Sequence, residues 1–277
     1  MGMVVNFNAA ALNAQRNLGQ TSKGLNQSIQ RLSSGLQVNG AADSPAGLVI
    51  SEQMRSKADG MSQAVKNTND GINLIKTAEG ALNEVHSLLR QMRTLSVHAA
   101  NEGVNSADDL AADQAAIAAA GDSIDRIGAS TRFNGKLLLD GNYTAQKLQI
   151  GEESTDTFDV SIADLTAVGL GVDSGTLDVT AVGGGTAAID AIDAAIKTVS
   201  TERAKLGATQ KYTLETTVNS LSVSEENIRS SESAIRDADM SKEMVEFTRN
   251  NIMMQAGTSM LAQANQSSQS VLSLLRG

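Results

Sequence analysis

Apolar residues recur at alternating spacings of four and three between residues 54 and 92, and this repeat restricts the possible folds more than any other feature. It puts one apolar stripe on an α-helix, and a second helix must cover that stripe. Ser44 and Pro45 suit the N-cap and the first helical position, so we expect the helix to run from there to about Asn101. It would span roughly 85 Å, more than the width of one globular domain. The stripe consists of Met54, Ala58, Met61, Val65, Thr68, Ile72, Ile75, Ala78, Leu82, Val85, Leu89 and Met92, with one repeated spacing of three before Ala78.

A second stripe is available to cover the first. Apolar residues recur every seven positions in residues 192–206 and again in residues 214–235. This predicts a second helix of similar length that packs antiparallel on the first. A further helix is predicted from Asn105-Ser106 to about Gly128, because the acids Asp108 and Asp109 suit the positive end of the helix dipole.

Residues 131–180 change to an apolar period of two. Asn134-Gly135 is a turn dipeptide, and apolar residues alternate with polar ones around Leu148 and Phe158. These features predict short strands or hairpins. The three glycines at 183–185 lack a following Lys-Ser or Lys-Thr, so we interpret them as a linker rather than a phosphate-binding loop.

The two ends of the chain contain no acidic residue, since all 31 acids lie between Asp43 and Glu246. The ends carry five basic residues, so with a net charge of −9 for the chain the middle carries −14. Ala, Gln, Asn, Ser and evenly spaced aliphatic residues fill the ends. Because burial of an unpaired ion costs several kcal/mol, we interpret the ends as segments that a partner covers.

Each end also carries an apolar seam at coiled-coil spacing. The two seams can pair with each other as a hairpin within one molecule. A hairpin buries only one stripe per helix, however, and leaves the absence of acids on the outer faces unexplained. We therefore favour contact on several sides, as in a polymer. The predicted polymerisation seam comprises Leu18, Leu25, Ile29, Leu32, Leu36, Met253, Met260, Ala264, Val271 and Leu274.

Composition excludes several classes of protein. Aromatic residues make up only 2% and cysteine is absent, which favours thin helix–helix seams and excludes a disulfide framework. An acidic chain without a basic stripe does not suit nucleic acid, and no apolar run has the length of a membrane span or the form of a signal peptide. His86 and His98 are predicted to be solvated helix-surface residues. We expect no catalytic residue, cofactor or metal site, and no enzyme activity.

The expected fold is mainly α. A long antiparallel coiled-coil or helical-bundle rod carries a small β-hairpin region and is flanked by N- and C-terminal helices that pair in the polymer. The predicted segments are residues 1–43 (terminal helix), 44–141 (first rod part), 142–186 (short β/loop region), 187–236 (second rod helix) and 237–277 (terminal helix).

Several motifs resemble bacterial flagellin in the order in which that family has them. The resemblance covers roughly residues 4–145 and 187–276, and its length makes it specific. The motifs are RLSSGL at residues 31–36, AADSPAG at 41–47, NDGI at 69–72, TAEGAL at 77–82, TRFNGK at 131–136, LDG at 139–141, QAGTSMLAQANQ at 255–266 and VLSLLR at 271–276.

The resemblance implies an extracellular structural subunit that polymerises with itself into the flagellar filament. Residues 1–43 and 237–277 would form an inner tube around the channel, the rod an outer tube, and residues 142–186 the variable region. Members of the family leave the cell through a type III export apparatus. They use an export chaperone, a filament cap and hook-associated junction proteins as partners.

Toll-like receptor 5 recognises many flagellins through a Leu-Gln-Arg-x-Arg-Glu-Leu stretch. The corresponding positions here keep Leu89, Arg93 and Leu95, whereas Gln91 replaces the first arginine and Thr94 the glutamate. A supporting glutamate on the next helix corresponds to Ala116. Because charge-assisted hydrogen bonds are the strong ones, the resemblance predicts weak recognition.

Other interpretations remain open. A flagellin-like hook–filament junction protein shares the helical ends, although the pattern at residues 263–276 favours the filament subunit. An adhesin or coiled-coil binding module predicts a monomer with protected termini, whereas a filament subunit predicts fast proteolysis near residues 40–55 and 235–250. The methionines at 253, 254 and 260 are typical of a helix seam or of an adaptable binding face.

Overall fold

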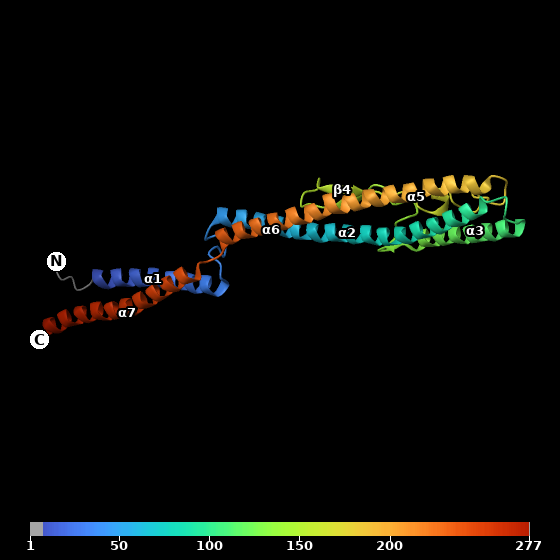
Figure 1. The fold of residues 1–277 in the computed structure, drawn as a ribbon. Coiled ribbons are helices and arrows are strands. Elements are labelled where there is room, and N and C mark those ends of the chain that lie inside the picture. Colours follow the sequence, from blue (N-terminus) through green and yellow to red (C-terminus); the bar gives the residue numbers. More distant parts are fainter. Residues whose placement is uncertain (1–7, 277) are drawn as a thin grey trace. The chain divides into compact units, whose positions relative to one another are not determined.

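The structure is a computed structural model that describes residues 8–276, with side chains as far as residue 266. It is mainly α-helical with two small antiparallel strand pairs, as the sequence predicts (Figure 1). The chain forms two compact units: unit 1 comprises Met1–Ser56 with Asn227–Gly277, and unit 2 comprises Lys57–Glu226. The elements are α1 (Ala9–Ser34), α2 (Pro45–Ala99), α3 (Ala107–Ser130), β1 (Arg132–Phe133), β2 (Lys136–Leu137), β3 (Gln146–Gln149), β4 (Thr157–Val160), α4 (Ala167–Leu170), α5 (Gly184–Ala208), the π-helix η1 (Thr209–Leu214), α6 (Glu215–Arg236) and α7 (Met240–Arg276).

Local sequence sets the helix ends in unit 1. The side chain of Asn8 caps α1 by accepting a hydrogen bond from the backbone N–H of Ala11 at 3.0 Å. Gly35 ends this helix with φ of 73°, a left-handed conformation that glycine adopts at little cost. The hydroxyl of Ser44 accepts a hydrogen bond from the Gly47 N–H at 3.1 Å, and α2 begins at Pro45. The predicted N-cap and first helical residue of this helix are therefore confirmed.

Unit 2 is a helical bundle built on the predicted apolar stripe. Leu82, Leu89 and Met92 of α2 are fully buried, whereas Met61 and Val65 nearer its start are half-buried. Ion pairs Glu79–Arg203 and Arg93–Asp193 align α2 and α5 antiparallel, as predicted. Further residues of the core are Ile72, Ile75, Ala78, Val85, Ile117, Ile124, Ile192, Val199 and Leu206.

The alternating apolar residues of the middle segment form the expected hairpin. Strands β3 and β4 pair antiparallel, with Leu148 opposite Phe158. The Asn-Gly dipeptide at residues 134–135 makes the turn between β1 and β2, and both residues have positive φ. Leu148 packs against the core of unit 2, so the strands cover part of the helical bundle.

The second apolar stripe contains one extra residue, and a π-helical turn accommodates it. Leu206 and Leu214 are separated by eight positions rather than seven. In a regular α-helix the extra residue would rotate the rest of the stripe by about 100°. The wide turn η1 takes up that residue, and Leu214 stays buried. Leu214 lies next to Gly71 of α2, since a Cβ on that glycine would lie 3.6 Å from Leu214 Cδ1. Gly71 directly precedes residues 72–78, where the apolar spacing of α2 is irregular, so the two irregularities face each other.

The glycines at residues 183–185 are not a linker, and that prediction is wrong. Gly183 has φ of 75° and lies just before α5, which already includes Gly184 and Gly185. A Cβ on Gly185 would lie 2.5 Å from the backbone nitrogen of Ala100. Gly185 therefore allows the start of α5 to pack directly beside the end of α2.

Both histidines were predicted to be solvated helix-surface residues, and the structure confirms this for His98 but not for His86. His86 is half-buried, and its Nδ1 atom is buried without a hydrogen-bond partner among the described residues. Burial, together with the charges of Arg90 and Arg203, lowers its pKa. His98 is exposed, but its Nδ1 lies 2.6 Å from Oδ2 of Asp113 on α3.

The His98–Asp113 pair predicts a local loss of stability at alkaline pH. The hydrogen bond and the charge of Asp113 raise the pKa of His98 above its ordinary 6.5. The charged histidine is thus favoured in the fold, so its contribution is fully present below 6.5 and disappears as pH rises through the raised pKa. We expect slower hydrogen exchange at the α2–α3 connection at about pH 6 than at about pH 9, after correction for intrinsic rates. His98→Gln should remove this difference, and an unchanged difference in that variant would contradict the assignment.

Candidate functional site

The acid-free ends lie together in unit 1, where α1 and α7 run antiparallel along each other (Figure 1). Leu18, Leu25 and Leu32 are half-buried, and Thr21 and Ser28 between them are buried. The leucines of the predicted seam therefore lie in the face of α1 that contacts α7. Leu36 follows the helix end and is also half-buried, with its backbone bridged to Asp237.

Glycines bring the two helices close. A Cβ on Gly24 of α1 would lie 3.1 Å from the side chain of Asn250. On the other helix, a Cβ on Gly257 would lie 2.9 Å from Leu18. Since glycine leaves room at both positions, side chains of each helix pack against the backbone of the other.

The predicted seam residues of α7 divide between two faces. Ala264 is half-buried, together with Met254 and Leu261, which share its face toward α1. Met253 and Met260 point elsewhere, with 49% and 65% of their surface exposed. The two remaining predicted positions, Val271 and Leu274, lie in α7, but their side chains are outside the described residues.

Ile29 of α1 is also on the outside, with 47% of its surface exposed. Unit 1 thus combines an internal helix seam with large apolar side chains that no part of the described chain covers. We call these side chains the outer apolar surface. It consists of Leu12, Ile29, Val49, Ile50, Met240, Met244, Val245, Ile252, Met253 and Met260.

Seven of these ten residues were not among the predicted seam positions, although the spacing of apolar residues in the sequence indicates two of them. Val245 and Ile252 are seven residues apart, which is the heptad period, and Ile252 adjoins Met253. The predicted single stripe instead combined positions from two faces of α7. A helix that contacts neighbours on several sides has more than one stripe.

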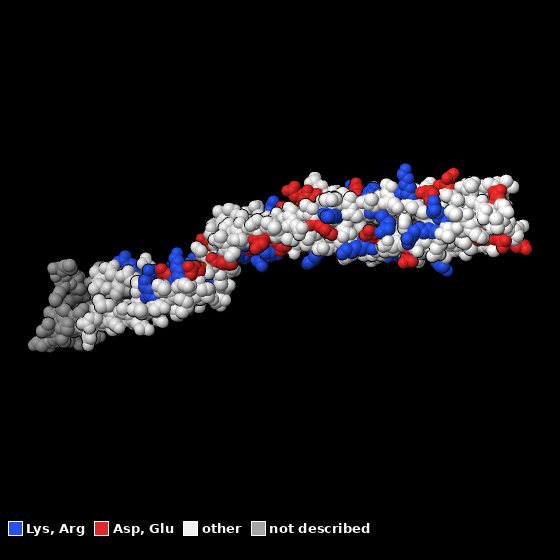
Figure 2. All heavy atoms as spheres, in the orientation of Figure 1, with Lys and Arg blue, Asp and Glu red and all other residues white. Residues whose placement is uncertain are grey.

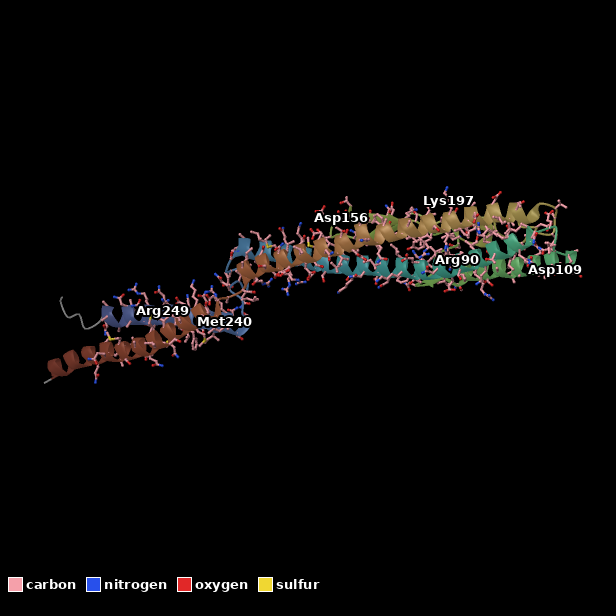
Figure 3. The ribbon with its side chains drawn as sticks, viewed as in Figure 1. Arg90, Asp109, Asp156, Lys197, Met240 and Arg249 are labelled. Atoms are coloured by element: carbon pink, nitrogen blue, oxygen red, sulfur yellow. The ribbon has the colours of Figure 1, made fainter. Side chains whose placement is uncertain are left out.

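Several charged side chains line a groove of about 510 Å³ between α1 and α7. Within it, Arg31 lies 3.7 Å from the buried Glu243, and Arg249 pairs with Glu246. Figure 2 shows red and blue atoms among wider white areas on the described part of this unit. Arg249 and Met240 both lie on α7 (Figure 3).

The receptor-like stretch of α2 lies in unit 2. Leu89 is buried and Leu95 is half-buried, whereas Gln91 is exposed. Arg93 is exposed as well, but its guanidinium donates to both carboxylate oxygens of Asp193, at 2.6 and 3.2 Å. This bond holds the pKa of Asp193 below its usual range. Of these two polar side chains, Gln91 is thus exposed and Arg93 is already paired.

Neither a metal centre nor a membrane span is recognisable in the part of the chain that the structure describes. No group of three or more His, Asp or Glu side chains among those residues is arranged to hold a metal ion. None of the described helices combines the length and the apolar character that crossing a membrane requires.

Comparison with known proteins gives matches to both halves of the chain. The family described as the bacterial flagellin N-terminal helical region matches residues 5–144, and the C-terminal helical region matches residues 189–275. A flagellin of Bacillus subtilis is 45% identical, over 99% of this chain and 100% of the relative.

Relatives from other bacteria agree with this match. A flagellin of Halalkalibacterium halodurans is 46% identical, and the flagellar filament 33 kDa core protein of Treponema phagedenis is 41% identical, each over 99% of this chain and all of the relative. The crystal structure of Bacillus cereus flagellin superposes with a TM-score of 0.50 at 29% identity and covers 56% of this chain and 88% of that one.

Proposed function

The chain belongs to the bacterial flagellin family, and we propose that the outer apolar surface of unit 1 is the device by which its copies join. It is a structural subunit of the flagellar filament that serves motility, and subunits of this family polymerise with one another. No observation favours the hook–filament junction protein as an alternative.

The observation that carries the proposal is that large apolar side chains remain outside the paired α1 and α7. Leu12, Ile252 and Met260 stand exposed on these helices, and no acidic residue occurs in residues 9–34 or 247–266. An exposed apolar surface of this kind is typical of a protein interface. Because acids are absent there and basic residues are few, that interface buries few charged groups when it loses its water.

Nine of the ten predicted seam positions then have two tasks, and the tenth, Leu36, bridges to Asp237 through its backbone. Those between the helices, Leu18, Leu25, Leu32 and Ala264, hold α1 and α7 together. Ile29, Met253 and Met260 contact other copies. Val271 and Leu274 complete the C-terminal seam in the filament.

We assign to the five predicted segments the roles that the resemblance to the family implies. Residues 1–43 and 237–277 form the inner tube. The rod parts, residues 44–141 and 187–236, form the outer tube with the short region 142–186 on its surface. The body of the subunit is strongly acidic by sequence, which suits contact with water and keeps the monomer soluble.

The filament subunit acts outside the cell and reaches that place by type III export. An export chaperone, a filament cap and hook-associated proteins are its partners, as family membership supports. It binds neither nucleic acid nor membrane, and it performs no catalysis and needs no cofactor.

Seeded growth tests the proposed function. Purified subunits should elongate fragments of filament, and electron microscopy of negatively stained samples would show the lengthening. A junction protein would bind the fragment ends without extending them, and that result would overturn the proposal.

Receptor recognition gives a separate prediction. We expect toll-like receptor 5 to respond to this protein at least about tenfold more weakly than to a flagellin with the complete motif, because a neutral amide replaces a charged donor. Gln91→Arg combined with Thr94→Glu should raise the potency in a cell reporter assay. Full potency of the unmodified protein would contradict the prediction.

A further inference from the structure

Sulfur in this protein is concentrated on one helix. The chain has no cysteine and ten methionines, and five of these lie between residues 240 and 260 in α7. Four of the five belong to the outer apolar surface: Met240, Met244, Met253 and Met260. The fifth, Met254, is half-buried on the side of α1.

Met253 and Met260 form the most regular part of this group. They are seven residues apart, so they lie two helical turns from each other on one face. Ala256 is between them on the same face and offers no side-chain hydrogen bond. The patch is therefore apolar and accessible, with two thioethers as its only reactive groups.

Peroxides convert an accessible thioether to a sulfoxide. The sulfur lone pair attacks one oxygen of hydrogen peroxide and the O–O bond breaks. The second oxygen leaves as water after proton transfer, so the methionine is oxidised and the peroxide is reduced. The product carries a strong hydrogen-bond acceptor where the side chain had been apolar.

We propose that Met253 and Met260 are an oxidation site that controls whether a subunit can join the filament. This inference rests on the proposed function, because it takes a second copy of this chain as the occupant of the patch. A sulfoxide oxygen that is covered by an apolar neighbour loses its water without a replacement, which opposes assembly. Met253 and Met260 are then accessible to oxidants in the free folded subunit and protected in the filament.

The first experiment compares the two states. Folded monomers and preformed filaments are treated with hydrogen peroxide, and mass spectrometry of peptides gives the extent of oxidation at each methionine. Met92, which is fully buried in unit 2, is the internal control in both samples. In monomers, Met253 and Met260 should oxidise at least about tenfold faster than Met92, whereas filaments should protect them.

The second experiment measures growth. Oxidised monomers should elongate seeds at least about tenfold more slowly, and methionine sulfoxide reductases should restore the rate. The double variant Met253→Leu, Met260→Leu should lose clearly less of its elongation rate after peroxide treatment than the natural protein loses, although Met240 and Met244 of the same surface stay oxidisable. Met240→Leu with Met244→Leu, at the start of the same helix, is the matched control and should remain sensitive. If leucine itself impairs growth, repair of the oxidised natural protein by the reductases still decides the question.

The outcomes separate the two claims. Undiminished elongation by monomers that are fully oxidised at both positions would overturn the oxidation proposal and leave the proposed function intact. Equal oxidation of Met253 and Met260 in monomers and filaments would show instead that no neighbour covers this patch. That result would contradict the proposed assembly surface as well.

Discussion

Ile29→Asp is expected to abolish filament growth while the monomer stays folded. Ile29 lies on the outer side of α1, with about half of its surface exposed, so an aspartate there remains hydrated in the free subunit. In the filament a neighbouring subunit would bury it. An uncompensated buried charge costs about 3 kcal/mol or more, which raises the critical concentration for assembly about 100-fold. Light scattering after addition of seeds measures the growth.

The control variant is Val168→Asp, which introduces the same charge at an exposed apolar residue of α4 in unit 2. It should assemble normally, and circular dichroism should show unchanged helix content in both variants. Leu32→Asp is a less discriminating test, because Leu32 is half-buried in the seam with α7 and its loss also weakens the hairpin. Normal filaments from Ile29→Asp would exclude this side of α1 from the interface.

Leu82→Ala is expected to destabilise unit 2 by about 3 kcal/mol. Leu82 is fully buried in the core, where α2 packs against the other elements of the bundle. Its truncation leaves a cavity and removes apolar contacts. For a unit of this size the melting temperature should fall by roughly 6–12 °C. Thermal unfolding of the monomer, followed by circular dichroism, measures the change.

Val223→Ala removes two methyl groups from an exposed position of α6 and is the matched control. Its melting temperature should change little. A similar small effect from Leu82→Ala would mean that the heptad stripe of α2 is not the structural core of unit 2.

Heptad spacing predicted much of the fold. The stripe on α2 and the antiparallel second stripe follow from where apolar residues recur, because helix geometry converts spacing directly into a face. The helix starts were predicted separately, from Ser44 and Pro45 for α2 and from Asn105-Ser106 with the acids that follow for α3, where the structure shows a complete capping box.

Features that depend on contacts distant in sequence could not be predicted in this way. The spacing from Leu206 to Leu214 indicates one extra residue, but only the structure shows that a π-helical turn accommodates it beside Gly71 of α2. Sequence alone suggests a linker at the glycines 183–185, because the close approach of Gly185 to Ala100 joins two positions far apart in the chain. The ion pair of the exposed His98 was not predicted because its partner, Asp113, is on another helix.

The candidate site was also predicted only in part, because its composition depends on contacts between helices that are distant in sequence. The absence of acids predicted that a partner covers both ends, whereas in the structure α1 and α7 pair with each other within one molecule. It did not determine which apolar residues the hairpin uses and which it leaves outside. Met253 and Met254 are adjacent in sequence, yet only the second shares the half-buried face toward α1.

The central claim is that the outer apolar surface of unit 1 is buried between copies of the chain. A reconstruction of the filament by electron cryomicroscopy tests it most directly. We predict that Ile29, Met253 and Met260 contact neighbouring subunits in the inner tube. A reconstruction in which these three side chains face open solvent would contradict the account.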